Sequence, residues 1–154
     1  MSDPENTLLI ETTQGKVTVE LRPDLAPGHV ARVKELVRQG FYDGVAFHRV
    51  IDGFMAQTGC PEGTGRGGSG KKLKAEFSQE KHVRGTVSAA RAMDPDSADS
   101  QFFICFEDAP WLDGQYSVWG KVTDGMDNVD KIKRGEPVQN PDKITSIKVA
   151  ADAA

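Results

Sequence analysis

One stretch of this chain, from Phe47 to Gly59, limits the possible folds because two β-prone segments meet there at a turn. Val45 to Val50 and Phe54 to Thr58 contain the β-branched and aromatic residues that are typical of strands. Between them, Ile51-Asp52-Gly53 supplies the glycine that a short hairpin link uses. The stretch therefore predicts a β-hairpin.

The side chains of this hairpin combine apolar groups with two polar ones. Because successive side chains in a strand point to opposite faces, Arg49 is expected to share a face with Phe47 and to leave His48 on the other face. By the same rule, Met55 and Gln57 share a face of the second strand. The hairpin thus predicts an apolar surface that carries a guanidinium and an amide.

The other β-prone segments are also short and bounded by turns. A first hairpin is expected from 8–12 and 16–21, because apolar and polar residues alternate along its second strand. Four later strands are expected at 85–92, 101–105, 116–122 and 143–149. In the last of these, Ile144 is out of phase with the alternation, as happens at a β-bulge.

Two helices interrupt the strands. The first is expected to open at Pro27 and end at Gly40, with valines at helical spacing between them. A shorter one follows Asp124, which can cap it, and ends before Gly135. With no linker in sight, the pattern predicts a single mostly-β domain, either a closed antiparallel barrel or a sandwich, capped by the helices.

Charge and composition narrow the function. Lys and Arg number 19 against 23 Asp and Glu in 154 residues, a net charge of −4, which argues against nucleic acid or an anionic membrane as a partner. The first residues are polar and acidic, and no long apolar run occurs, so a cytoplasmic location is expected. Cys60 and Cys105 are expected to be free thiols used as small apolar residues.

The glycine-rich segment from Gly59 to Gly70 fits part of a phosphate-binding loop. That loop needs Ser or Thr after its lysine, whereas Lys72 follows Lys71 here, and it needs a long helix next, which 71–77 does not predict. A surface loop with sharp turns is therefore expected instead.

Five longer segments together resemble one known family. They are Phe47-His48-Arg49-Val50-Ile51, Phe54-Met55-Ala56-Gln57-Thr58-Gly59, Ser100-Gln101-Phe102-Phe103-Ile104-Cys105, Trp111-Leu112-Asp113-Gly114 and Gly120-Lys121-Val122. In these residues and their order the chain resembles the cyclophilins, the cyclosporin-binding family of peptidyl-prolyl cis-trans isomerases. The resemblance runs from about Asn6 to Val149.

The resemblance implies a fold, a reaction and partners. The fold is a closed eight-stranded antiparallel β-barrel capped by two α-helices, in a single domain over 1–154 with its core at about 6–149. The reaction is rotation of X-Pro peptide bonds, without cofactor or metal, in proline-containing peptides and unfolded protein chains, which assists protein folding. Cyclosporin-type inhibitors are implied as further ligands, and the protein is expected to be a monomer.

The resemblance also assigns roles to individual residues. Arg49 matches the family's catalytic arginine. The residues that match its substrate-binding groove are Phe54, Met55, Gln57, Ala90, Arg91, Gln101, Phe103, Trp111, Leu112 and Tyr116. Many eukaryotic members have Asn in place of Arg91, which resembles bacterial members, and His in place of Tyr116.

Simpler interpretations of the same residues exist. Taken alone, Arg49 reads as a surface arginine in a salt bridge, and the apolar groove residues read as core. His29 and His82 read as solvated, since the three histidines lack metal-ligand spacing. Two rival functions are a proline-peptide binding module that uses the same groove without turnover and, more weakly, a nucleotide-binding protein.

Overall fold

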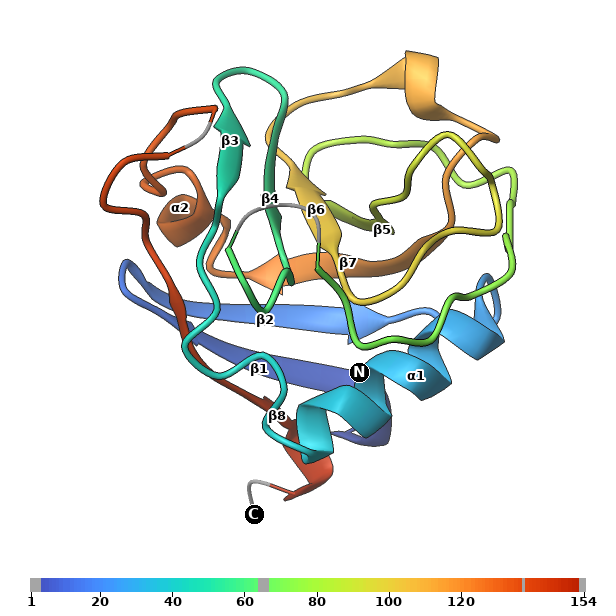
Figure 1. Ribbon diagram of the computed structural model, residues 1–154, viewed down its shortest axis with the longest axis horizontal. Helices are drawn as coiled ribbons and strands as arrows, with labels where there is room; N and C mark the ends of the chain where they lie inside the picture. The colour runs from blue at the N-terminus through green and yellow to red at the C-terminus, as the bar shows by residue number, and fades with distance from the viewer. Residues whose placement is uncertain (1–3, 64–66, 137, 153–154) are drawn as a thin grey trace.

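The computed structural model describes residues 4–63, 67–136 and 138–152. Its strands are β1 Thr7–Thr12, β2 Gly15–Leu21, β3 Arg49–Ile51, β4 Met55–Thr58, β5 Thr86–Ala89, β6 Phe102–Cys105, β7 Val118–Asp124 and β8 Ile144–Val149. Its helices are α1 Pro27–Arg38, α2 Met126–Val129 and the 3-10 turns η1 Pro4–Asn6, η2 Pro110–Leu112 and η3 Ala150–Asp152. Figure 1 shows α1 and α2 far apart around a curved sheet, and apolar residues of both helices belong to one core.

All eight strands belong to one antiparallel sheet in the order β3-β4-β6-β5-β7-β2-β1-β8. The prediction of a closed barrel is wrong. The sheet turns through 223° and remains an open half-barrel, with β3 at one end and β8 at the other.

Closure fails because β3 is too short to form a ladder with β8. Only three residues of the expected strand at 45–50 and its link are in β3. The preceding chain instead makes an isolated bridge between Ala46 and Lys143, and Phe47 N donates to Asp142 O at 2.9 Å. Single bonds of this kind join the two edges without continuing the sheet.

The chain just before β3 is irregular, and this irregularity changes which side chains share a face. Phe47 and Val50 both lie in the main core, although a regular strand would point them to opposite faces. Arg49 is partly exposed on the other side of the sheet. The prediction that Arg49 shares a face with Phe47 is therefore wrong, because the chain before Arg49 is not a strand.

Several other predictions are confirmed. The first hairpin pairs β1 with β2, and the register between β1 and β8 shifts where Thr12 meets Ile144, which places the expected bulge. Cys60 and Cys105 are free and buried. Chain 71–77 contains no helix, while 64–66 of the glycine-rich segment lie outside the described residues.

No helix in the described ranges is long and apolar enough to cross a membrane.

Helix α1 begins at Pro27 as predicted, whereas the cap of α2 differs from expectation. Gly125, not Asp124, precedes α2, and its φ of 86° lies in the left-handed region that glycine tolerates. At α1, Ala26 offers no capping side chain, and Glu76 from a distant loop takes that role. Its carboxylate accepts hydrogen bonds from the backbone N–H groups of Gly28 at 3.0 Å and His29 at 2.7 Å.

The same carboxylate explains why one histidine is not solvated as predicted. His29 is 1% exposed, and its Nδ1 lies 2.5 Å from Glu76 Oε1. Burial alone would raise the pKa of Glu76, but the bonds from the His29 ring and from the backbone N–H groups outweigh it, so the pKa is lowered from its ordinary value of 4.5. Glu76 thus stays ionised at the positive end of the helix.

We expect Glu76→Ala to lower the free energy of unfolding at pH 7 by about 1 kcal/mol, as for loss of a helix cap. Because the folded pKa lies below 4.5, this contribution is complete above that pH and disappears as the pH falls through the folded value. Urea unfolding at a series of pH values measures it, with the exposed Glu107→Ala as control. Equal losses in the two variants would contradict the capping role.

Candidate functional site

A second apolar cluster lies on the opposite face of β6 from the main core. Phe102 and Ile104 point into the main core, whereas Phe103 and Cys105 belong to the second cluster, as the alternation along this strand predicts. On the neighbouring strand β4, Met55 pairs with Cys105 and joins the same cluster. The pairing of two short strands therefore builds an apolar floor outside the core.

A small cavity of about 70 Å³ opens above this floor. Its walls come from the turn before β4, from η2, where Leu112 is 7% exposed, and from the segment after η2, where the Tyr116 ring packs at 5.8 Å against Phe103. The residues that line it are Phe54, Met55, Gln57, Ala90, Arg91, Phe103, Leu112 and Tyr116. Its size and apolar lining suit a small ring.

Arg49 lies beside this cavity and is held from two sides. Its Nε donates to Glu136 Oε2 at 2.6 Å, and its Nη1 donates to Gln57 Oε1 at 3.3 Å. Arg49 and Gln57 are also direct partners in the pairing of β3 with β4. The salt bridge that the simpler interpretation expected is thus present, yet the guanidinium has five N–H groups, so donors remain beyond those two bonds.

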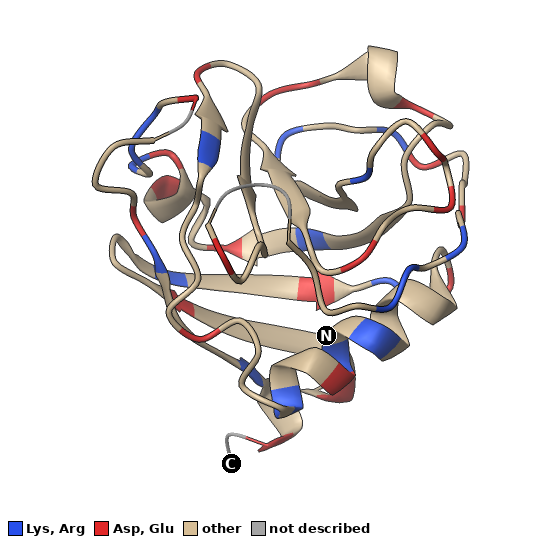
Figure 2. Ribbon diagram, viewed as in Figure 1, with Lys and Arg blue, Asp and Glu red and all other residues tan. Residues whose placement is uncertain are grey.

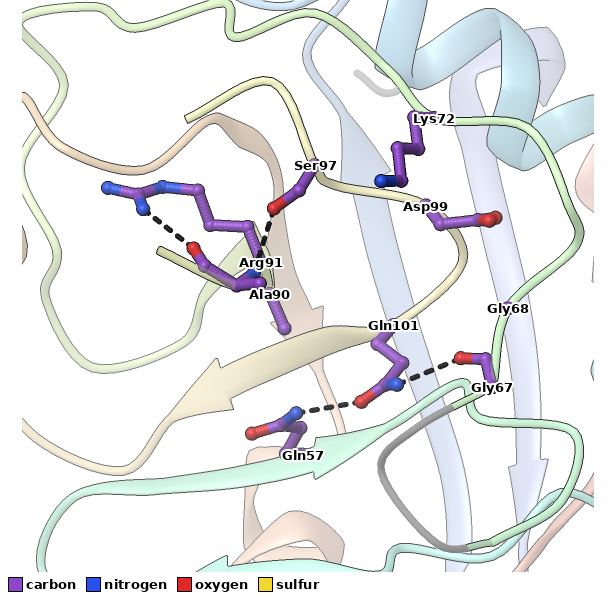
Figure 3. A pocket seen from close by; sticks show the side chains of 10 residues that line it. Gln57, Gly67, Gly68, Lys72, Ala90, Arg91, Ser97, Asp99 and Gln101 are labelled. Atoms are coloured by element: carbon purple, nitrogen blue, oxygen red, sulfur yellow. Dashed lines mark hydrogen bonds between the residues drawn. The ribbon is translucent and has the colours of Figure 1, made fainter. Parts of the chain in front are cut away.

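Side-chain amides continue from Arg49 along the floor of the groove. Gln57 Nε2 donates to Gln101 Oε1 at 2.9 Å, and Gln101 Nε2 donates to the carbonyl of Gly67 at 2.9 Å. Figure 3 shows this chain of bonds crossing from β4 to the glycine-rich loop. Each amide is oriented by its neighbours, so the position of the guanidinium is tied to the loop on the far side.

A larger cavity of about 330 Å³ adjoins the first and shares Gln57, Ala90 and Arg91 with it. Asp99 holds its outer wall in place, because its carboxylate accepts from Ser69 N at 2.8 Å and from Gly70 N at 3.0 Å. The full lining is Gln57, Gly67, Gly68, Lys72, Ala90, Arg91, Ala92, Ser97, Asp99 and Gln101. The two cavities form a continuous groove that is apolar at one end and polar at the other.

A buried histidine supports the apolar end from below. His82, predicted to be solvated, is 1% exposed and lies parallel to the Phe103 ring at 6.1 Å. Its Nδ1 is 3.1 Å from Asp113 Oδ1 and its Nε2 is 3.0 Å from Ser88 Oγ. The prediction failed because the charged residues that flank His82 in sequence turn outward while its own ring turns inward.

Burial at the floor favours the neutral forms of His82 and Cys105. Burial lowers the pKa of His82 and outweighs the raising effect of Asp113, which favours the neutral ring, while the Ser88 hydroxyl donates to the carbonyl of Ser117 at 3.2 Å. The His82 backbone N–H and ring lower the pKa of Asp113. Burial raises the pKa of the Cys105 thiol to about 12. The floor therefore contains no reactive thiolate at neutral pH.

The residues singled out from the sequence lie together. Eight of them line the small cavity, Gln101 lines the larger one, and Arg49 is bonded to Gln57. Trp111 is 60% exposed at the margin, with its ring 5.6 Å from that of Phe54. The structure brings all of them to one groove.

Sequence reasoning missed several contributors to the groove, and Glu136 and Asp99 are two of them. Glu136, the ion-pair partner of Arg49, lies 87 residues away, and no local pattern marks it. Asp99 belongs to the loop between β5 and β6, to which the sequence assigned no role. The acidic residues of that loop and the glycines of 67–70 were separate signals, and neither showed that one binds the other.

Comparison with known proteins gives the family. The family model for cyclophilin type peptidyl-prolyl cis-trans isomerases matches residues 7–149. A probable peptidyl-prolyl cis-trans isomerase of Brucella suis is 55% identical over 98% of this chain and 86% of its own length. Peptidyl-prolyl cis-trans isomerase B of Bacillus subtilis is 46% identical over 79% of this chain and 85% of its own.

Solved structures agree. A cyclophilin from Hirschia baltica superposes with a TM-score of 0.92 at 32% identity, covering 99% of this chain and 77% of that one. A cyclophilin type isomerase of Cryptosporidium parvum, crystallised in the presence of the dipeptide Ala-Pro, gives a TM-score of 0.86 at 30% identity over 93% of this chain and 98% of that one. With its fold, groove and sequence in agreement, this chain belongs to the cyclophilin-type peptidyl-prolyl cis-trans isomerases.

Proposed function

We propose that Arg49 is the catalytic donor for the isomerisation that this family performs. Rotation about an X-Pro bond faces a barrier of about 18–20 kcal/mol because the amide loses its resonance. In the twisted amide the prolyl nitrogen regains a lone pair that can accept a hydrogen bond. A guanidinium that stays charged and is fixed in direction stabilises that state more than either planar isomer.

The observation that carries this proposal is the pair of bonds that fixes Arg49 next to an apolar cavity. Glu136 and Gln57 occupy Nε and Nη1, which leaves Nη2 for a substrate amide. Because Gln57 also lines the cavity, the donor and the binding site share a side chain. Fixed donors cost no reorganisation when the charge of the amide changes.

We assign the small cavity to the proline ring. Met55, Phe103 and Leu112 supply its buried apolar surface, and Phe54 and Tyr116 close its sides. The amides of Gln57 and Gln101 then face the peptide backbone, and Ala90 and Arg91 form the edge beside the residue before proline. The small volume of about 70 Å³ and the apolar floor suit a five-membered ring.

The substrates that follow are exposed X-Pro bonds in peptides and unfolded protein chains, and the role is assistance in folding. An accessible groove suits a flexible chain, and Figure 2 shows both signs of charge distributed through the fold, which suits clients of varied composition. We further propose that the protein works in the cytoplasm, where its two free thiols stay reduced, as a single-domain monomer without a cofactor.

We expect Arg49→Ala to reduce the catalysed cis-trans exchange of a short Ala-Pro-Phe peptide by roughly two to three decades, since one fixed donor is worth about 2.7–4 kcal/mol. Exchange spectroscopy by NMR measures both the rate and the binding of the peptide. Arg38→Lys, at the end of α1 and away from the groove, serves as control.

Two outcomes separate the candidate functions. Loss of rate with the peptide still bound supports Arg49 as the donor. If the wild type binds the peptide without accelerating exchange, the enzyme assignment fails and a proline-peptide binding module replaces it.

We expect Trp111→Ala to weaken binding of cyclosporin by about thirtyfold, as for loss of an aromatic anchor, while turnover of a short peptide falls much less. Trp111 is exposed at the margin of the groove, where a large ligand can cover it and a small one need not. Calorimetric titration and the exchange assay give the two numbers on one protein sample. Equal losses of cyclosporin affinity and of peptide turnover would contradict a role of Trp111 in binding the large ligand alone.

A further inference from the structure

The pairing of β5 with β7 stops at the edge of the groove. Ser88 pairs with Val118, and the next backbone bond runs from Ala89 N to Ser117 O at 2.9 Å. In this register residue 91 faces residue 115. An ordinary antiparallel ladder would place the following rung there, and a backbone rung holds its strands about 4.7–4.9 Å apart.

A side chain takes the place of that rung. The guanidinium of Arg91 donates to the carbonyl of Gln115 from Nε at 3.2 Å and from Nη2 at 2.8 Å. Its Nη1 donates to the carbonyls of Ala92 at 2.9 Å and Met93 at 3.2 Å. One flat group therefore joins the segment leaving β5 to the segment entering β7, at a distance set by its own width.

The same guanidinium also covers a wall of the apolar cavity. Its central carbon lies 4.6 Å from the centre of the Tyr116 ring, while the edge of that ring meets Phe103. Figure 3 shows Arg91 running away from Gln101 and the chain of amides. With at least four of its bonds made to backbone carbonyls, Arg91 is occupied by the protein itself.

We propose that Arg91 is a positioning residue, a spacer that sets the separation between the edge at Ala90 and the wall at Tyr116. This inference rests on the proposed function, since it concerns the passage of the residue before proline between those two sides. Without the spacer, the backbone of residue 91 can approach Gln115 and continue the ladder. The passage then narrows, and a bulky residue before proline is excluded more than a small one.

Two variants test the spacer. Arg91→Lys keeps the charge but loses the planar fork, and Arg91→Met keeps the apolar stem but loses the charge. In both we expect the ratio of kcat/KM for Leu-Pro over Ala-Pro peptides to fall about tenfold. A ratio measured on one sample does not depend on the fraction folded, so a loss of stability alone leaves it unchanged. Arg38→Lys is the matched control, and NMR signals of the Tyr116 ring report its displacement.

Three results would be decisive. If wild-type turnover is present and sensitive to Arg49→Ala but both Arg91 variants keep the wild-type ratio, the spacer role is wrong. If the ratio for Glu-Pro over Lys-Pro peptides changes in Arg91→Met and not in Arg91→Lys, the charge acts on the substrate directly and the spacer role is again wrong. Absence of wild-type turnover would instead overturn the proposed function on which it rests.

Discussion

The alternation of side chains along β6, held by its pairing with β4 and β5, is the constraint on which the rest of the structure depends. It sends Phe102 into the core and Phe103 to the groove, so one strand of four residues contributes to the main core and to the proposed proline cavity. A shift of its register by one residue would exchange the two rings and remove both. The position of the floor is accordingly fixed by the register of the sheet that carries it.

The groove places its polar and apolar parts on different kinds of support. The apolar floor lies on paired strands, whereas the donors reach it through side-chain bonds that run from Glu136 to Gly67 by way of Arg49, Gln57 and Gln101. Such a chain is oriented by every member, so a change at either end alters the direction of the guanidinium without touching the floor. If the proposed roles hold, binding of the proline ring and stabilisation of the twisted amide can therefore vary separately.

Local pattern predicted most strands, and the matched segments predicted the groove. The failures have physical causes that lie far apart in the sequence. Phe47 and Arg49 were placed on one face because the chain between them was taken as regular, although its bonds go to the segment before β8. The polar neighbours of His29 and His82 in the sequence predicted solvated rings. Both rings are instead buried, and each contacts a carboxylate that is distant in the sequence, Glu76 or Asp113. Likewise, closure of the barrel depends on whether two distant edges meet, which short-range alternation does not encode.

The open edges of the half-barrel have a consequence for an enzyme whose substrates are peptides. An unpaired edge strand offers a template on which another extended chain can add. Here Gly135 exchanges backbone bonds of 2.8 Å with Val50 on β3, and Ile144 on β8 exchanges bonds of 2.7 and 2.8 Å with Gly44 and Val45. These segments occupy donors and acceptors at both edges. An extended peptide at the groove therefore finds these backbone groups already bonded and cannot use them to extend the sheet.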